Sequence, residues 1–445
     1  MLREMVSEHK IKLVLLGDIL VFFFSLFLML FLRYGEKNIR SEFKIHFFPF
    51  VILLLIWIIV FYIIDLYSHT NINSTIKNKK KLVVAVFINF IFSLSIFYIF
   101  GNFFSLTPKT NLIIFTIIFI FLDYLWRYFF SWLLQQKFNN KNIILLSSST
   151  LNSKILEYLK INPQLGYSTN ISTPEEFLKN ETIDPKNTTI VVDNQSFSDP
   201  EILKKLYSLI SQKIEVISLA DFYEKLFARI PLTEINEEWF INEVKSNYHL
   251  NDTIKNILDK IFSILFLIIL SPFFLIIAIL VKITSSGPIF YKQTRTGENN
   301  KIFVLYKFRN MYNDPLLNPD ALGQVPTWCQ NEDTRVTKIG KILRETHLDE
   351  LPQLWNILRG DISFVGPRPE RPEFAETLEK EIPHYLFRQI IRPGLSGWAQ
   401  IKFRYSNTIL ESKEKFEYDL YYIKNRNIFL DARILLKTIQ FVFTH

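Results

Sequence analysis

Two adjacent carboxylates, Asp349 and Glu350, stand in a segment whose other residues suit phosphate chemistry. Arg344 comes five residues before Asp349, and Arg368 is flanked on both sides by proline. Flanking prolines restrict the backbone and would hold the guanidinium for bidentate contact with a phosphate. An ionised carboxylate beside such arginines can serve as a nucleophile or as a metal ligand. The alternative is an ordinary acidic helix cap, which needs no ligand.

The two carboxylates are expected at the beginning of a short helix. Pro352 cannot lie deep inside a helix, so a helix over the apolar positions of 351–358 should begin within a few residues before it. Gly360 is expected to end that helix. Asp349 and Glu350 would then meet the exposed amides of the first turn, where the helix dipole favours a negative charge.

A basic hairpin is predicted upstream of this segment. Residues 288–311 have the pattern of two strands around a turn at 297–300. Four cations crowd this hairpin: Lys292, Arg295, Lys307 and Arg309. Such a cluster is either a solvated basic face that meets lipid headgroups or a binding site for a polyanion.

Membrane-seeking sequence dominates the first third of the chain. Apolar runs occupy residues 13–32, 47–64, 82–100 and 112–134. Each run is close to the roughly 20 residues that cross a hydrocarbon core. The runs predict a membrane protein with an α-helical four-span N-terminal bundle, whose two ends lie on one side of the membrane.

Charged residues around these runs bear on orientation. The positive-inside rule places the basic residues before the first run and between the second and third in the cytoplasm: Arg3, Lys10, Lys12, Lys77, Lys79, Lys80 and Lys81. The loop after the first run argues the other way, with Arg33, Lys37, Arg40 and Lys44. Inside the fourth run, Asp123 and Arg127 lie one helical turn apart and are expected to pair with each other.

A small parallel α/β domain is predicted after residue 141. Strand-like segments at 142–150 and 188–193 alternate with helix-like segments at 152–163 and 200–212. A dinucleotide site would need glycines in the turn after the first strand, because glycine lets the backbone approach the pyrophosphate. That turn carries three serines instead, at 147–149. We therefore expect a Rossmann-like middle domain without the glycine fingerprint, in a structural or regulatory role.

A later apolar run, residues 261–281, is long enough to cross a bilayer but has Pro272 at its centre. Proline removes one helical hydrogen bond and should kink the helix, and Ser271 can help satisfy the freed backbone carbonyls. The residues alone leave two alternatives open, a kinked span and a re-entrant helix that returns to the same face.

Composition narrows the class of partner. The chain has 445 residues, a net charge of +8 and a single cysteine, Cys329. One cysteine excludes an internal disulfide framework and Cys-rich zinc sites. We find no zinc-finger or RNP-like pattern, so we expect no nucleic acid and assign the positive charge first to membrane lipids.

From about residue 253 onwards the chain resembles the bacterial sugar transferases, the polyprenyl-phosphate hexose-1-phosphate transferases also called monotopic phosphoglycosyl transferases. The matching phrases are "SPFFLIIAILVK", "GPIFYKQTRTG", "YKFRNM", "TRVTKIGKILRETHLDELPQLWNILRGDISFVGPRPERPEF" and "RPGLSGWAQIKFRY". The preceding part resembles the large subclass of that family. The resemblance implies a bundle at 1–138, a degenerate Rossmann-like domain at 139–250 and an α/β catalytic domain at 251–445, anchored by a re-entrant membrane helix at about 254–283.

The resemblance implies a two-step exchange on the cytoplasmic face of the bacterial inner membrane. Asp349 would attack the sugar-proximal phosphate of a UDP-sugar and release UMP. Polyprenyl (undecaprenyl) phosphate would then take the hexose-1-phosphate from the enzyme. Glu350 would assist as base or metal partner, with Mg²⁺ as the cofactor and both carboxylates as its ligands. Such a step initiates exopolysaccharide, capsule or O-antigen assembly.

Further site residues follow from the resemblance and from the basic hairpin. The expected phosphate contacts are Arg344, Arg368, Arg404, Lys307 and Arg309. The Ser271-Pro272 pair would break the re-entrant helix.

Two rival functions come from other classes. A membrane-anchored nucleotide-sugar dehydratase would need the glycine fingerprint and a Tyr-x-x-x-Lys pair, and the sequence contains neither. A non-catalytic scaffold of a polysaccharide export complex would not need the intact dyad with its arginines. The identity of the sugar and the existence of a homodimer are left open.

Overall fold

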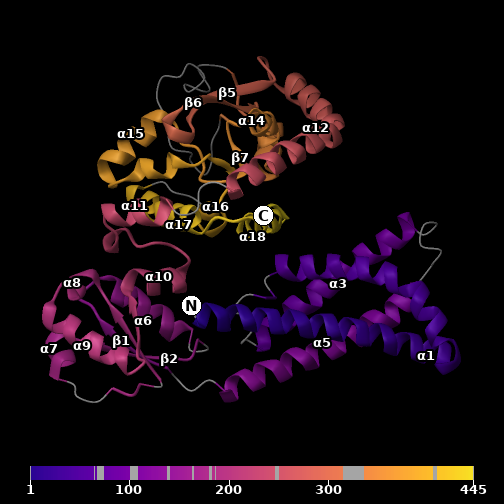
Figure 1. The fold of residues 1–445 in the computed structure, drawn as a ribbon. Coiled ribbons are helices and arrows are strands. Elements are labelled where there is room, and N and C mark those ends of the chain that lie inside the picture. Colours follow the sequence, from indigo (N-terminus) through magenta and orange to yellow (C-terminus); the bar gives the residue numbers. More distant parts are fainter. Residues whose placement is uncertain are drawn as a thin grey trace. The chain divides into compact units, whose positions relative to one another are not determined.

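The computed structural model describes residues 2–64, 66–67, 75–100, 109–137, 141–162, 165–179, 183–185, 187–245, 250–313, 335–403 and 408–443. The chain divides into two compact units, Met1–Ile217 and Ser218–His445 (Figure 1). The domain boundaries expected after residues 138 and 250 stay predictions.

The first unit contains three long helices followed by alternating strands and shorter helices. Its elements are α1 (Leu2–Ile63), α3 (Thr75–Ile99), α5 (Lys109–Lys137), β1 (Lys141–Leu146), α6 (Leu151–Ile161), β2 (Tyr167–Ser172), α7 (Pro174–Lys179), β3 (Thr188–Val192), α8 (Asn194–Phe197), α9 (Pro200–Ser211) and β4 (Glu215–Ser218).

Helix α1 reverses direction at Gly35. The φ of 70° and ψ of 176° at this residue are non-helical, and glycine adopts a positive φ without steric cost. The Phe22 ring lies 5.6 Å from that of Trp57, and the Phe23 ring lies 5.8 Å from that of Phe47, so the two arms of α1 run antiparallel. The two arms, with α3 and α5, carry the four predicted apolar runs, which the structure confirms as long apolar helices.

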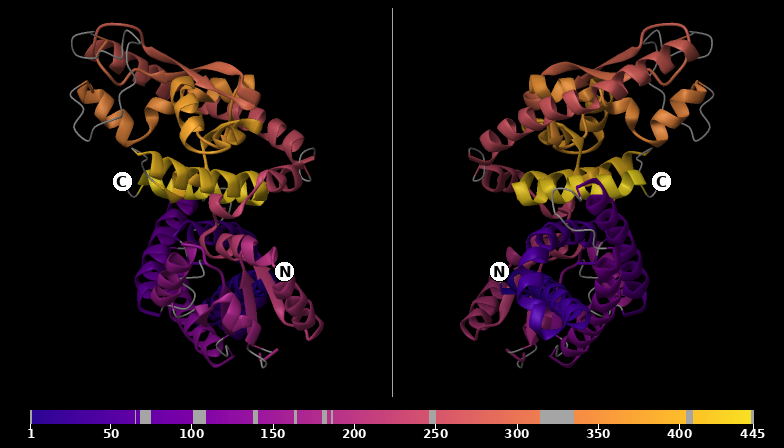
Figure 2. Two further views of the ribbon diagram at one scale, coloured as in Figure 1. Left: turned by 90° about the vertical axis from the view of Figure 1, so that its left-hand side faces the viewer. Right: turned by 90° about the vertical axis from the view of Figure 1, so that its right-hand side faces the viewer.

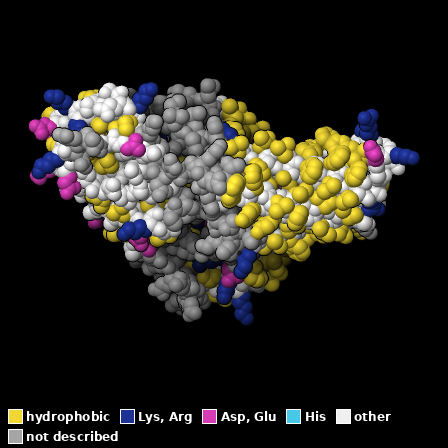
Figure 3. Space-filling model, turned by 90° about the horizontal axis from the view of Figure 1, so that it is seen from below, with side chains coloured by type: hydrophobic (Ala, Val, Ile, Leu, Met, Phe, Trp, Pro, Cys, Tyr) yellow, Lys and Arg dark blue, Asp and Glu magenta, His cyan; other side chains and the backbone are white. Residues whose placement is uncertain are grey.

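The outside of the bundle is apolar as well as its inside. The rings of Phe22, Phe50, Trp57, Phe115 and Phe119 are buried together in its core. Other large apolar side chains of the same helices are exposed, and Figure 3 shows them covering much of the bundle surface. A surface of this kind belongs in lipid. The chain is therefore a membrane protein with several candidate spans.

The predicted pair inside the fourth run is confirmed. Arg127 Nε donates to Asp123 Oδ2 at 2.8 Å. The same guanidinium forms an ion pair with Asp18 of α1, which also accepts a hydrogen bond from the Tyr67 hydroxyl at 2.8 Å. A buried ion cluster therefore ties α5 to α1, in place of the simple pair that the spacing predicts.

A four-stranded sheet follows the bundle, in the order β2-β1-β3-β4. β1 pairs in parallel with both β2 and β3, as predicted for this region. At the carboxyl edge the Asp193 carboxylate accepts hydrogen bonds from the Ser148 amide at 3.0 Å and the Ser196 amide at 2.8 Å. The serine turn after β1 is thus engaged by the protein's own carboxylate, which agrees with the expected lack of a usual nucleotide site.

The second unit combines a long apolar helix with short strands and helices. Its elements are α10 (Leu219–Phe227), η2 (Leu232–Glu234), α11 (Glu237–Lys245), α12 (Leu250–Thr284), β5 (Phe290–Thr296), η3 (Glu298–Asn300), β6 (Ile302–Phe308), α13 (Lys338–Glu345), η5 (Leu348–Glu350), α14 (Gln353–Arg359), β7 (Ser363–Val365), α15 (Pro372–Glu381), η6 (Tyr385–Ile390), β8 (Gly394–Ser396), α16 (Trp398–Lys402), α17 (Ile409–Asn425) and α18 (Ile428–Phe443). The predicted basic hairpin is confirmed, because β5 and β6 pair antiparallel around η3.

Helix α18 packs against both strands of a two-stranded parallel sheet, β7 with β8. Figure 2 shows the C-terminal helices in yellow next to the orange segments of the same unit. Just beyond β7 the chain passes β8 at very close range. A Cβ atom added to Gly394 would lie 2.0 Å from the Gly366 amide nitrogen, and one added to Gly366 would lie 2.5 Å from the Arg392 carbonyl oxygen. Only glycine fits at this crossing, which directly precedes the Pro-Arg-Pro segment.

Candidate active site

A buried asparagine fixes the strand of the site to its helix. Asn356 of α14 is fully buried, and its Oδ1 accepts from the Tyr306 amide at 3.1 Å. Its Nδ2 donates to the Val304 carbonyl at 2.7 Å. These bonds satisfy β6 backbone groups of both kinds. These two hydrogen bonds of Asn356 hold β6 against α14, so Lys307, which follows Tyr306, lies next to the turn that leads into α14.

That turn is short and tight. His347 adopts a left-handed conformation with φ of 55°, and η5 then carries both carboxylates. Because Pro352 has no N–H, the Leu348 carbonyl cannot make the usual helical bond and accepts instead from the Leu351 amide at 3.3 Å. The helix predicted here is confirmed and ends before Gly360, but it begins at Gln353, after Pro352 rather than before it. The carboxylates therefore lie in the preceding 3₁₀ turn.

Each carboxylate of the dyad has its own set of partners. Asp349 is 5% exposed, and its Oδ2 accepts from Asn310 Nδ2 at 2.8 Å. Glu350 Oε1 accepts from Lys307 Nζ at 2.6 Å and from Arg368 Nη2 at 2.8 Å. Adjacent residues thus present one carboxylate bound to a neutral amide and one bound to two cations.

The two carboxylates have opposite pKa shifts. Burial raises the pKa of Asp349, and the Glu350 charge adds to that rise, while Lys307 and Arg344 oppose it. Burial would also raise the pKa of Glu350, but Arg368 and Lys307 outweigh burial and hold it well below its usual range. The charge on Glu350 is therefore secured by cations rather than by the helix start. Asp349 is the more basic of the two groups.

The structure brings some of the predicted phosphate contacts together and separates others. Lys307 and Arg368 both reach the dyad through Glu350. Arg344, at the end of α13, acts on the pKa of Asp349 through its charge. Arg309 does not reach the dyad, because its Nη2 donates to the carbonyls of Val281 and Ser285 at the end of α12. Arg404 lies outside the described residues.

The predicted helix break has the expected local chemistry. Ser271 Oγ donates to the Ile268 carbonyl at 2.8 Å, which is the carbonyl that Pro272 cannot bond. Figure 1 shows α12 bending along its length. The role of this pair as a re-entrant break stays a prediction.

Comparison with known proteins finds relatives of the C-terminal part of the chain. A sequence profile described as bacterial sugar transferase matches residues 250–445. The exopolysaccharide production protein PSS of Rhizobium leguminosarum bv. phaseoli is 39% identical over 191 residues, which cover 42% of this chain and 93% of that protein. The chain belongs to the bacterial sugar transferase family.

Longer relatives match the same part of the chain. The UDP-N-acetylgalactosamine-undecaprenyl-phosphate N-acetylgalactosaminephosphotransferase of Aeromonas hydrophila is 37% identical over 231 residues, 52% of this chain and 53% of that protein. The UDP-glucose:undecaprenyl-phosphate glucose-1-phosphate transferase of Klebsiella pneumoniae is 42% identical over 192 residues, 43% of this chain and 40% of that protein. The match therefore spans about half or less of these relatives' length.

One residue of the candidate site was missed by sequence reasoning. Asn310 orients Asp349, and its own backbone is held by the Thr337 amide, which donates to the Asn310 carbonyl at 3.1 Å. The residue stands directly after Arg309 in the phrase "YKFRNM". The charged residues Lys307 and Arg309 before it indicate phosphate binding because of their charge. An asparagine is neutral, so its residue type alone does not indicate a role in the site. Only the fold reveals its role.

The residues of the dyad fit a magnesium ion. In the described ranges, no group of three or more His, Cys, Asp or Glu side chains converges. Mg²⁺ is commonly held by one or two carboxylates together with substrate phosphates and water. The contacts described above engage one oxygen of each carboxylate, Asp349 Oδ2 and Glu350 Oε1. Two adjacent carboxylates of this kind match that donor set.

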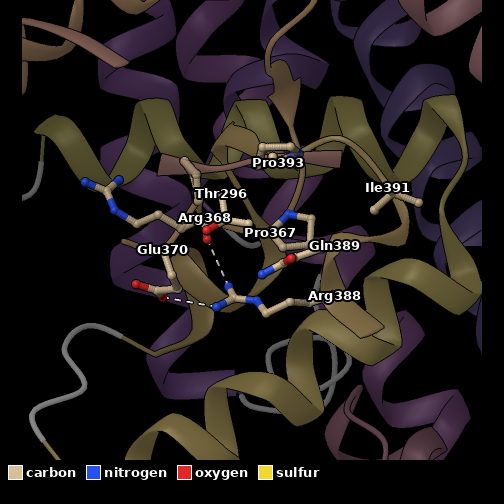
Figure 4. A pocket seen from close by; sticks show the side chains of 10 residues that line it. Thr296, Pro367, Arg368, Glu370, Arg388, Gln389, Ile391 and Pro393 are labelled. Carbon is tan, nitrogen blue, oxygen red and sulfur yellow. Dashed lines mark hydrogen bonds and ion pairs between the residues drawn. The ribbon is translucent and has the colours of Figure 1, made fainter. Parts of the chain in front are cut away.

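A small pocket opens beside the Pro-Arg-Pro segment. It is lined by Arg368 and its flanking prolines, together with Arg388, Gln389 and Ile391. Figure 4 shows Arg388 reaching toward Glu370 and toward the backbone of Arg368. The backbone that carries Arg368 is therefore supported from inside the unit.

Proposed function

We propose that this protein transfers a hexose-1-phosphate from a UDP-sugar to undecaprenyl phosphate. An oxygen of Asp349 attacks the sugar-proximal phosphorus, and the bond from that phosphorus to the bridging oxygen breaks. UMP leaves with the bridging oxygen, and a sugar-phosphate ester remains on Asp349. An oxygen of undecaprenyl phosphate then attacks the same phosphorus and frees the Asp349 carboxylate.

The observation that carries the proposal is the unequal dyad. Asn310 holds Asp349 by one oxygen, and Glu350 holds Lys307 and Arg368 beside it. Phosphoryl transfer needs an oriented nucleophile and cations near the charged oxygens, and this arrangement supplies both. The names of the Aeromonas and Klebsiella relatives support the same donor and acceptor classes.

Mg²⁺ is the proposed cofactor, with Asp349 and Glu350 as its protein ligands. When bound, it would neutralise charge on the diphosphate and so assist departure of UMP. Glu350 keeps its negative charge because Lys307 and Arg368 lie against it. The same carboxylate can therefore bind Mg²⁺ and hold Arg368 in position.

We further propose that α12 is re-entrant and that the catalytic unit lies on the cytoplasmic face of the bacterial inner membrane. Both halves of α12 pack on the same unit, which supports this topology. Before Pro272, Ser263 Oγ donates to the Leu354 carbonyl at 2.6 Å. After Pro272, Ile277 and Val281 pack in one buried cluster with Phe308. A helix that crossed the bilayer would carry one half away from this unit.

The pathway assignment follows from the chemistry. A lipid-linked sugar diphosphate is a starting unit for polymer assembly, and the Rhizobium relative is named for exopolysaccharide production. Initiation of exopolysaccharide, capsule or O-antigen assembly is therefore the proposed role, and a homodimer stays a prediction.

The decisive test incubates the purified full chain with Mg²⁺ and a panel of UDP-sugars that includes UDP-glucose and UDP-N-acetylgalactosamine. Without lipid, UMP should appear in a burst no larger than the amount of enzyme, and the protein should gain one sugar-phosphate in mass. Turnover should begin only when undecaprenyl phosphate is added. UMP that appears only with both substrates present would instead indicate direct transfer, and Asp349 would then act as base or metal ligand.

Topology is tested separately by cysteine labelling. After replacement of Cys329 by serine, single cysteines at Asn194 and Asn299 should both react only from the cytoplasmic side. Labelling from opposite sides would make α12 a membrane span.

A further inference from the structure

The Pro-Arg-Pro segment is held along its whole backbone. Four consecutive carbonyls each accept a hydrogen bond of 2.9 to 3.0 Å: Pro367 from the Gly394 amide, Arg368 from Arg388 Nη2, Pro369 from Arg295 Nη1 and Glu370 from the Thr296 amide. Proline restricts the backbone further at two of these positions. The segment therefore has little freedom to move relative to the rest of the unit.

Arg388 is the centre of this support. Its guanidinium is 3% exposed and donates to the Arg368 carbonyl at 3.0 Å, to Glu370 Oε1 at 3.1 Å and to the Tyr385 hydroxyl at 2.6 Å. It also forms an ion pair with Asp419 of α17, with Nη2 2.7 Å from Oδ2. One side chain thus links the backbone of Arg368 to a buried helix.

Lysine could not replace this arrangement. Arginine presents several N–H donors in a rigid planar fork, whereas lysine has one nitrogen at the end of a flexible stem. A lysine at position 388 could keep one ion pair, but it could not bond the Arg368 carbonyl, Glu370 and Asp419 at once. The charge would remain while the alignment is lost.

The side chain of Arg368 reaches from this supported segment to Glu350 of the dyad. Arg368 Nη2 lies 2.8 Å from Glu350 Oε1, while its side chain remains 35% exposed. A guanidinium held on one side and open on the other can receive a phosphate oxygen without first being ordered. Its position depends on the backbone that Arg388 holds.

We propose that Arg388 is a positioning residue for the transfer reaction, which fixes the backbone of Arg368 so that its guanidinium meets the donor diphosphate in a single orientation. This inference rests on the proposed function. The partners of Arg388 described above are Glu370, Tyr385, Asp419 and the Arg368 carbonyl, and none of them is a dyad carboxylate.

The test compares R388K with R229K in the purified full chain. Arg229 is the matched control, because it is also buried and pairs with carboxylates of α17, namely Glu414 and Glu417. R388K should lower kcat/KM for the UDP-sugar by about 10- to 100-fold, the upper end being the scale of a misplacement of about 1 Å, and by no more than R368K does, because Arg388 acts through Arg368. R229K should stay within about twofold of wild type when both variants unfold at matched temperatures.

A double-mutant cycle separates positioning from general damage. If Arg388 acts through Arg368, adding R388K to R368K should lower kcat/KM by less than about threefold, because the group to be positioned is already lost. Multiplicative losses, or R388K as active as R229K, would overturn the positioning role. A wild-type enzyme that releases no UMP from any UDP-sugar would instead refute the proposed function itself.

Discussion

The first unit and the second unit each bury an aspartate next to a short turn, but they use it differently. Asp193, at the carboxyl edge of the sheet, engages both oxygens with the backbone amides of Ser148 and Ser196. Asp349 accepts a side-chain hydrogen bond through one oxygen, from Asn310, and lies beside a carboxylate that gathers two cations. The two buried carboxylates therefore differ in their surroundings: Asp193 meets backbone amides, whereas Asp349 lies next to a carboxylate that binds two cations.

The contrast also bears on the prediction that the sheet lacks a nucleotide site of the usual kind. In such a site the amides after the first strand face the pyrophosphate. Here the Ser148 amide faces Asp193, so an anion would have to displace a carboxylate of the same charge. In the second unit, by contrast, Lys307 and Arg368 place positive charge around Glu350, and the proposed diphosphate substrate would meet these cations.

The largest effect is expected from D349N, the substitution that tests the chemical side of this comparison. An amide of the same shape is not a nucleophile, so UMP release should fall at least about 1,000-fold. Membrane insertion and thermal unfolding should stay at wild-type values, because packing is preserved. Normal UMP release by this variant would remove Asp349 from the nucleophile role.

A smaller loss is expected from R368K, which keeps the charge beside Glu350 but loses the planar fork. kcat/KM for the UDP-sugar should drop by about 10- to 100-fold. R371K is the matched control, because Arg371 lies three residues further along and pairs with the exposed Glu373. The control should retain nearly full activity, and equal losses in the two variants would point to a diffuse electrostatic effect.

D193A should lower stability without changing UMP release, whereas D349N should lower UMP release without changing stability. Two backbone amides lose their acceptor, so the first unit should be destabilised by about 1 to 3 kcal/mol. UMP release per folded molecule should not change. Thermal unfolding of the purified protein measures the first quantity and the burst assay the second. A fall in the burst rate at full folding would mean that the sheet takes part in transfer.

The smallest expected effect is the change at acidic pH in the stabilisation that Glu370 provides. Burial would raise the pKa of Glu370, but Lys415, Arg388 and Arg295 hold it well below its ordinary value of 4.5. The ionised form is therefore favoured by folding, and this stability is fully present above pH 4.5 and is lost as the pH falls toward the lower folded pKa. The difference in unfolding free energy between wild type and E370Q should be constant above pH 6 and narrow by about 0.8 kcal/mol at pH 4. If the difference in unfolding free energy between wild type and E370Q instead increased as the pH fell, the lowered pKa assigned to Glu370 would be wrong.

Local sequence patterns predicted the elements around the site well. The helix between Pro352 and Gly360, the hairpin turned at 297–300 and the parallel strands of the first unit all follow from short-range rules and are confirmed. Such features depend on residues that are neighbours in the chain, where turn chemistry and apolar spacing act directly.

The roles of individual arginines could not be read in the same way. Arg295 and Arg309 belong to the basic hairpin, yet both donate to backbone carbonyls of distant segments, at Pro369 and at Val281. Every residue has a backbone carbonyl, so the sequence does not indicate which carbonyl will accept a hydrogen bond from a given arginine. Arg388 escaped notice for the same reason. A reversal between the first two apolar runs is predicted, but its position at Gly35, inside an otherwise helical segment, is not.

The glycine crossing between Gly366 and Gly394 restricts how this protein can vary over generations. A side chain at either position would collide with the backbone of the other strand or its flank, at 2.0 to 2.5 Å. Backbone atoms are common to all residues, so no second substitution can clear the space. A replacement of glycine at either position therefore requires the backbone itself to move, which would shift the Pro-Arg-Pro segment that directly follows Gly366.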